Sequence, residues 1–155
     1  MAWVVDTCVL IDVLEDDPNF GIPSAKALDA HAADGLVVCP ISYAELAPAF
    51  QGDKGLQDEF LAGVGIDYLQ DWGWEDTVRA HQAWNDLVRR RRAREVPKRP
   101  LADILIGAFA TRFQGLLTRN PADFAPVFPG LEMPAFLTPT PDQHLPSAGR
   151  LRPRS

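Results

Sequence analysis

Short apolar runs that alternate with longer segments of helical periodicity constrain the fold of this chain more than any other feature. The four runs are Ala2–Asp6, Leu36–Cys39, Ile66–Leu69 and Leu116–Thr118. Each is short enough to be a single buried strand. Strands that are separated by helices pair in parallel, and helices cover both faces of a parallel sheet. The sequence therefore predicts an α/β fold with a short, mainly parallel central sheet.

Apolar spacing and helix-breaking residues predict the helices between these strands. A first helix begins near Cys8 and ends at Asp16-Asp17-Pro18, because proline cannot continue a helix. The other predicted helices are Pro23–Ala33, Ser42–Phe50, Asp53–Ala62, Glu75–Arg92 and Leu101–Phe113.

The C-terminal residues have a different composition from the rest. A last edge strand, interrupted by Pro134, is predicted over Leu131–Leu137. Residues 138–155 contain four prolines and three arginines and have few large apolar side chains. Such a segment buries too little to order itself, so we expect one domain over 1–137 and a disordered tail after it.

Length and composition limit the cellular setting. The chain has 155 residues, enough for one compact domain. Its longest apolar run, Leu36–Ile41, is far shorter than the roughly 18 residues of a membrane span. The first residues lack the basic lead and apolar core of a secretion signal, which predicts a cytoplasmic protein. Cys8 and Cys39 are then expected to be reduced.

The charge is distributed unevenly. The net charge is −6, yet residues 79–99 alone carry +6 and the remainder of the chain −12. Such asymmetry favours a local surface for a polyanion on an acidic body, although a solvated helix face is the alternative. The basic side chains closest together are Arg89, Arg90, Arg91, Arg92, Arg94, Lys98 and Arg99.

Acidic and amide side chains follow the predicted strands, at the edge of a parallel sheet where ligands gather. Asp6 ends the first predicted strand. Glu45 lies in the first turn of the helix that follows the second strand, and Asp103 lies in the first turn of the helix that leads into the last strand. Asn120 and Asp123 follow the last strand. Carboxylates that converge repel one another unless a cation lies between them, and oxygen ligands suit Mg²⁺ or Mn²⁺.

Each acid also has a structural interpretation. Ser42-Tyr43-Ala44-Glu45 matches a capping box, and Asp6, Asp103 and Asp123 could stabilise helix or turn termini. Spacing alone leaves both interpretations open.

Four motifs in order resemble those of the PIN-domain family over residues 3–137. They are Val4-Val5-Asp6-Thr7-Cys8, Ile41-Ser42-Tyr43-Ala44-Glu45, Leu101-Ala102-Asp103-Ile104 and Leu117-Thr118-Arg119-Asn120. The short chain and its Phe128-Pro129-Gly130 segment are most similar to VapC-type toxins. The resemblance implies a three-layer α/β/α fold and an Mg²⁺- or Mn²⁺-dependent endoribonuclease that leaves a 3′-hydroxyl and a 5′-phosphate.

The resemblance also implies a role for individual residues. Asp6, Glu45 and Asp103 match the catalytic, metal-binding acids, and Thr7 and Thr118 match hydroxyls that line the site. Asn120 stands where many family members have aspartate, which leaves Asn120 or Asp123 as the fourth ligand.

The basic side chains of residues 89–99 would hold RNA phosphates next to these acids. The resemblance further implies a homodimer and a cognate antitoxin that covers the active site.

Other functions are compatible with the same residues. A PIN-fold nuclease could process RNA without being a toxin, and a degenerate PIN-fold module could bind without catalysis. A haloacid-dehalogenase-like phosphohydrolase would need a second aspartate where this chain has Cys8.

Overall fold

The four apolar runs form one parallel sheet in a computed structural model, which describes residues 1–135. The strands are β1 (Trp3–Val5), β2 (Leu36–Val37), β3 (Ile66–Asp67) and β4 (Gly115–Leu117). Their order across the sheet is β3-β2-β1-β4, so β1 lies between β2 and β4. All three pairings are parallel. The predicted α/β fold is confirmed.

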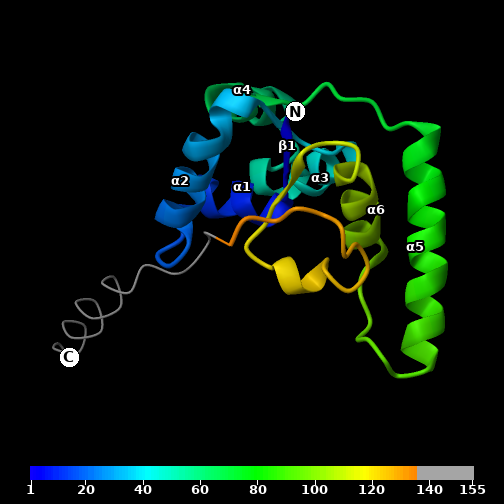
Figure 1. The fold of residues 1–155 in the computed structure, drawn as a ribbon. Helices are drawn as coiled ribbons and strands as arrows, with labels where there is room; N and C mark the ends of the chain where they lie inside the picture. Colours follow the sequence, from blue (N-terminus) through cyan, green and yellow to red (C-terminus); the bar gives the residue numbers. More distant parts are fainter. Residues whose placement is uncertain (136–155) are drawn as a thin grey trace, which may run out of the picture.

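The helices connect consecutive strands in the chain order, and Figure 1 shows how they are arranged around β1. The α-helices are α1 (Thr7–Leu14), α2 (Gly21–His31), α3 (Pro40–Glu45), α4 (Lys54–Gly63), α5 (Trp74–Arg92) and α6 (Leu101–Ala110). Short 3₁₀ turns span η1 (Ala32–Asp34), η2 (Ala47–Phe50) and η3 (Pro121–Asp123).

Both faces of the sheet are buried, because alternate residues of a strand point to opposite sides. On one face, Val5 packs with Leu10 of α1, Leu28 of α2 and Leu61 of α4. On the other face, Val4 packs with apolar side chains of α6, among them Phe109. The molecule therefore has three layers, with helices on both sides of the sheet.

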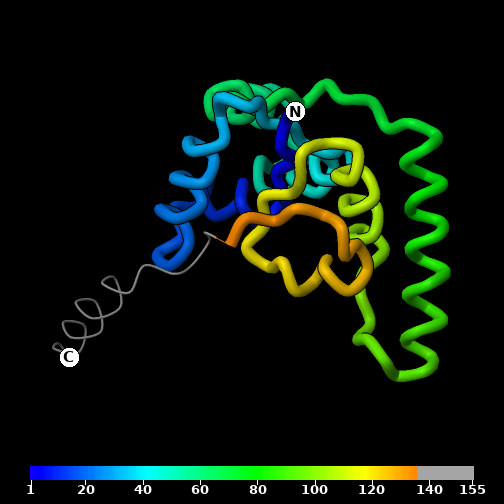
Figure 2. Tube along the Cα trace, in the orientation of Figure 1, coloured from blue at the N-terminus to red at the C-terminus, as the bar shows by residue number. Residues whose placement is uncertain are grey.

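Helix α5 lies outside this sandwich, against α6. A third apolar cluster joins Leu87 of α5 to Ile104 of α6 and Phe128. Gly107 permits the close approach of Phe128, since a β-carbon at Gly107 would lie 2.3 Å from the Phe128 ring. In Figure 2, α5 accordingly runs along the edge of the molecule beside α6.

The predicted edge strand over 131–137 is wrong for the residues that the structure describes. Residues 131–135 form no strand, and one backbone hydrogen bond joins them to β4, from Leu116 N to Glu132 O over 2.9 Å. Pro134 has no N–H to donate, so a regular ladder cannot continue. Residues 136–155, including the predicted tail, lie outside the described residues.

Helix boundaries also differ from the predictions. The helix predicted over 42–50 begins at Pro40 and ends at Glu45, and a 3₁₀ turn follows it. The reason is that Pro40 is well suited to the first helical turn, where its missing N–H costs nothing. Within residues 1–135, no helix combines the length and the hydrophobicity needed to cross a membrane.

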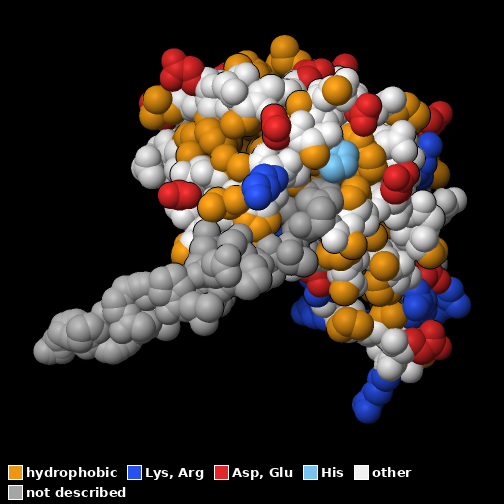
Figure 3. All heavy atoms as spheres, turned by 60° about the vertical axis from the view of Figure 1, so that its left-hand side comes forward, with side chains coloured by type: hydrophobic (Ala, Val, Ile, Leu, Met, Phe, Trp, Pro, Cys, Tyr) orange, Lys and Arg blue, Asp and Glu red, His pale blue; other side chains and the backbone are white. Residues whose placement is uncertain are grey.

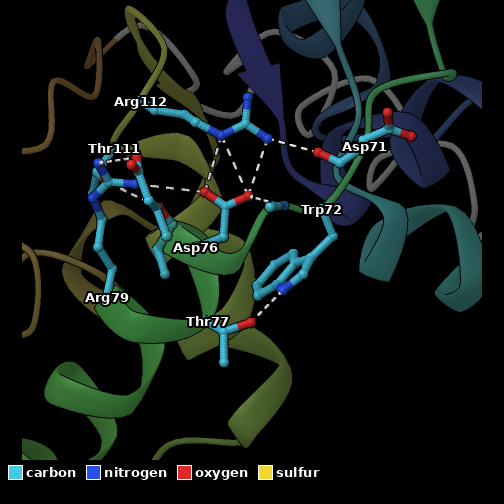
Figure 4. A network of polar contacts seen from close by, with 10 residues as sticks. Asp71, Trp72, Asp76, Thr77, Arg79, Thr111 and Arg112 are labelled. Atoms are coloured by element: carbon cyan, nitrogen blue, oxygen red, sulfur yellow. Dashed lines mark hydrogen bonds and ion pairs between the residues drawn. The ribbon is translucent and has the colours of Figure 1, made fainter.

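A buried ion pair fastens the start of α5 to the end of α6. Asp76, fully buried, accepts hydrogen bonds from Arg112 Nε at 2.9 Å and from the backbone N–H of Gly73 at 2.9 Å. Arg112 Nη2 also donates to the Asp71 carbonyl at 2.7 Å, and its guanidinium lies 4.7 Å from the Phe109 ring centre. Figure 4 shows this network around Asp76.

We predict that Arg112→Met lowers the free energy of unfolding by about 3 kcal/mol, because it removes the closest counter-charge of the buried Asp76 carboxylate and leaves only the longer ion pair with Arg79 at 3.5 Å. Urea unfolding followed by circular dichroism measures the change. The matched control is Lys54→Met, which removes an exposed ion pair to Asp58 and should cost no more than about 1 kcal/mol. Equal losses in the two variants would contradict the role of this network.

Candidate active site

Asp6 occupies the carboxyl end of β1 and caps α1. Its Oδ1 accepts the backbone N–H of Thr7 at 2.8 Å, and its Oδ2 accepts the Thr118 hydroxyl at 2.8 Å. The Cys8 thiol donates to Oδ2 at 3.4 Å. The Asp6 carboxylate therefore caps α1 and is also a candidate site residue. Thr7 and Cys8, which follow β1, and Thr118, which follows β4, hold it in one orientation.

The sheet register brings these neighbours together. Val5 of β1 pairs with Leu117 of β4, and the backbone N–H of Asp6 donates to the Leu117 carbonyl at 3.0 Å. Asp6 and Thr118 are consequently the next residues along two adjacent parallel strands. Parallel strands end at the same edge of a sheet, as the ligand-binding rule for α/β folds requires.

Burial raises the pKa of Asp6, and the negative charge of Asp103 raises it further. The hydrogen bonds from Thr118, Cys8 and Thr7 oppose this rise only in part.

Among the described residues, three aspartates are buried, and Asp6 differs from the other two. Asp12 is paired with Arg119 at 2.9 Å, and Asp76 is paired with Arg112 at 2.9 Å. Asp6 has no basic partner in residues 1–135. A buried carboxylate that faces another acid and lacks a counter-charge is typical of a functional site.

Asp103 lies in the first turn of α6, as predicted. Its Oδ2 is 3.0 Å from Arg99 Nη2, and the same nitrogen is 3.0 Å from Asp123 Oδ2. Arg99 therefore bridges an acid of α6 and an acid of η3.

Glu45 joins the group from α3 through a hydroxyl. Its Oε1 accepts the Thr7 hydroxyl at 2.7 Å, and its side chain is exposed. Contrary to the prediction, Glu45 is the last residue of α3 rather than a first-turn residue, because the helix begins at Pro40. The capping box at Ser42–Glu45 is wrong for the same reason.

The two candidates for the fourth ligand lie differently. Asn120 is exposed, and its backbone N–H donates to Thr118 Oγ1 at 3.1 Å. Asp123 lies in η3 and shares Arg99 with Asp103. Asp123, rather than Asn120, thus has its side chain linked to one of the predicted acids.

The donor chemistry of the site suits a hard divalent cation. The charge of Asp103 raises the pKa of Asp6, and a cation between the two carboxylates would relieve that repulsion. The acids are nevertheless arranged in two groups, Asp6 with Glu45 through Thr7, and Asp103 with Asp123 through Arg99. No cluster of three acidic, histidine or cysteine side chains suited to one metal ion occurs within residues 1–135.

The basic side chains of residues 89–99 begin at the end of α5 and lead into α6. Arg89 and Arg90 pair with Asp86, and Arg90 also pairs with Glu95. In this part of the described chain, no ion pair is formed by Arg91, Arg92, Arg94 or Lys98. Most of the Lys and Arg side chains visible in Figure 3 lie at its lower right.

Two roles near the site were not predicted from the sequence. Arg119, which follows Thr118, pairs with Asp12 and lies over the Phe20 ring at 4.7 Å, so it anchors the residues after β4 on α1. Asp12 is the only charge between Val9 and Leu14, which was the available signal. The second role is that of Arg99, which precedes α6 and pairs with Asp103 of its first turn. The available signal was the four-residue spacing of these two residues, which is typical of ion pairs along a helix.

Cys8 is not a nucleophile in this arrangement. Burial raises the pKa of its thiol to about 12, and the nearby charge of Asp6 adds to that effect. The thiol therefore stays protonated at neutral pH, and the thiolate is the reactive form.

We predict that Asp6→Asn stabilises the protein at neutral pH by about 0.5–2 kcal/mol, because it removes an unpaired buried charge and keeps a good capping residue. The folded state raises the pKa of Asp6, so the wild type loses stability as pH rises from the unfolded pKa through the folded one. The advantage of the variant should therefore shrink as pH falls toward 4. Urea unfolding between pH 4 and 7 measures the difference in the free energy of unfolding. An Asp6→Asn variant that is less stable than the wild type at pH 7 would contradict the interpretation of Asp6 as an unpaired buried charge.

Comparisons with known proteins support the fold. The chain matches no protein-family model and no curated protein. It is similar to a chain in the crystal structure of VapBC2 from Rickettsia felis bound to a DNA fragment from their promoter. The TM-score is 0.66 at 16% identity, and the match covers 86% of this chain and 98% of that chain. This likeness shows that the two chains share a fold over nearly their whole lengths.

Proposed function

We propose that this protein is a PIN-type, metal-dependent endoribonuclease and the toxin of a toxin–antitoxin pair. The observation that carries the proposal is the buried Asp6 carboxylate, whose pKa is raised by burial and by the charge of Asp103 and which has no basic partner within residues 1–135. Its position at the carboxyl end of a central parallel strand is the expected place for a ligand.

The side chains of the site divide the chemical work. Asp6 and Asp103 would hold the divalent cation, and Glu45 would act as the base. A bound divalent cation lowers the pKa of its water and polarises a phosphoryl oxygen. The Thr118 hydroxyl keeps the Asp6 carboxylate oriented by its 2.8 Å hydrogen bond. Thr7 donates to Glu45 Oε1, which leaves Glu45 Oε2 to accept a proton from the attacking water.

An acidic site repels RNA unless basic groups hold the backbone nearby. The segment from Arg89 to Arg99 ends four residues before Asp103, and several of its charges have no acidic partner in the described chain. We propose that these side chains bind phosphates on both sides of the cleaved bond.

A protein antitoxin is the proposed partner, together with a second copy of this chain. The support for an antitoxin partner is the shared fold with a chain of VapBC2, whose structure was determined bound to promoter DNA. Growth arrest on expression in a bacterial host, absent for Asp6→Asn, would separate a toxin from an RNA-processing nuclease.

The central prediction is metal-dependent RNA cleavage. Purified protein should cut total RNA into discrete fragments with Mg²⁺ or Mn²⁺, and EDTA should stop the reaction. Asp6→Asn and Asp103→Asn should each slow cleavage on the order of 100-fold or more, because each removes a charged ligand. Gel electrophoresis and mapping of the fragment ends for 5′-phosphates measure the effect.

Asp29→Asn is the matched control for the cleavage assay. It removes an exposed carboxylate of α2, away from the site, and should cut at the wild-type rate. Intact RNA with wild-type protein that still binds Mn²⁺ would favour the degenerate binding module.

Replacing Arg91, Arg92 and Lys98 by glutamine together should weaken RNA binding and reduce its dependence on salt. Each lost phosphate contact lowers the slope of log affinity against log salt by about 0.7 for single strands, or roughly 2 for all three. Fluorescence anisotropy in the Asp6→Asn background, which does not cut, measures both quantities. Lys26→Gln on α2 is the control for loss of charge alone, and an equal effect there would contradict a defined phosphate surface.

A further inference from the structure

Arg99 differs from its basic neighbours because its guanidinium contacts two acidic side chains. Its Nη2 lies 3.0 Å from Asp103 Oδ2 and 3.0 Å from Asp123 Oδ2, so one nitrogen serves two carboxylates. Arg91, Arg92, Arg94 and Lys98, by contrast, have no acidic partner among the described residues. Arg99 is the basic side chain of this segment that is directed to the acids.

The Arg99 head group is only partly satisfied where it lies. Its Nε is buried and has no hydrogen-bond partner within the described chain, while its side chain as a whole is 25% exposed. A buried N–H without an acceptor opposes burial, so the attraction of the two carboxylates must hold the guanidinium in place. Release into water would give this N–H a partner at once.

The position of Arg99 also bears on Asp103. Asp103 Oδ2 accepts a charged hydrogen bond from Arg99 at 3.0 Å, so a metal ion that binds this carboxylate meets the repulsion of a neighbouring positive charge. The charge of Asp103 raises the pKa of Asp6, and Asp103 itself is paired with Arg99. The guanidinium thus supplies to Asp103 and Asp123 the positive charge that a divalent cation would otherwise supply.

We propose that Arg99 is an internal cation that competes with the divalent metal for Asp103, so that the guanidinium weakens metal binding and metal binding favours its release from this carboxylate. The inference rests on the proposed metal site. Arg99 acts here as a positioning residue, because it controls which charge Asp103 meets rather than taking part in the reaction. The released guanidinium joins the neighbouring basic side chains that have no acidic partner.

The test is a calorimetric titration of chelator-treated protein with Mn²⁺ alone, without RNA. Arg99→Gln should bind Mn²⁺ on the order of tenfold more tightly than the wild type, the usual size of coupling between two competing ligands. Arg99→Lys should fall between them, because an ammonium keeps the charge but lacks the planar fork that serves two carboxylates. Lys26→Gln removes the same charge from exposed α2 and should stay within about twofold of the wild type.

Two further measurements separate competition at Asp103 from a general change in the fold. Thermal melting without metal shows whether each variant is folded. If Arg99→Gln does not fold, Arg99→Lys, which keeps the charge, serves as the test variant. Adding Asp103→Asn to Arg99→Gln should abolish the gain in affinity, since the carboxylate for which the two cations compete is then absent.

Affinity for Mn²⁺ that is unchanged or lower in Arg99→Gln would overturn the inference, as would a failure of every variant to bind Mn²⁺. The cleavage assay judges the nuclease separately. Tighter Mn²⁺ binding without RNA cleavage would keep the role of Arg99 and reject the nuclease. RNA cleavage by the wild type together with unchanged Mn²⁺ affinity in Arg99→Gln would keep the nuclease and reject the role of Arg99.

Discussion

The pairing of β1 with β4 positions the rest of the candidate site. Asp6 comes directly after Val5, Thr118 comes directly after Leu117, and these two strand residues are partners in the sheet. The hydroxyl of Thr118 reaches the Asp6 carboxylate because the register sets both at the same height. A shift of one residue would turn these side chains to opposite faces of the sheet. The buried apolar side chains of both strands thus hold the polar site in register.

Charge balance is the second constraint on this molecule. The buried aspartates that serve the structure, Asp12 and Asp76, each have an arginine from the C-terminal half of the chain. These pairs join α1 to the residues after β4, and α5 to the end of α6. Asp6 is buried without such a partner in the described residues, and the charge of another acid, Asp103, raises its pKa. Folding therefore leaves a concentration of negative charge at one edge of the sheet, which the rest of the structure must tolerate.

The sequence allowed the strands and the places of Asp6 and Asp103 in the fold to be predicted, because both depend on local signals. Short apolar runs form strands, and Asp6 and Asp103 lie at strand and helix ends that the neighbouring residues determine. The position of Glu45 at the end of α3 was missed because Pro40, read as the end of a strand, is the first residue of the helix. The bridge from Arg99 to Asp123 was missed because it joins residues 24 positions apart through the packing of η3 near α6. The same limit applies to residues 131–135, whose single bond to β4 depends on Pro134 and on the turn before it. Contacts between distant residues follow from tertiary packing, which local patterns do not report.

The distance along the chain between Asp6 and Thr118 matters while the protein is being made. Chains fold from the N-terminus as they leave the ribosome, and β1 can pair with β2 long before β4 exists. During that time β1 is an edge strand, and the Asp6 carboxylate lacks both the Thr118 hydroxyl and the carbonyl of Leu117 that accepts its N–H. The last strand of the sheet to be synthesised is thus the one that completes the site. A nascent chain that stops before residue 115 contains all three predicted catalytic acids, yet it lacks the strand that sets Asp6 in its final orientation.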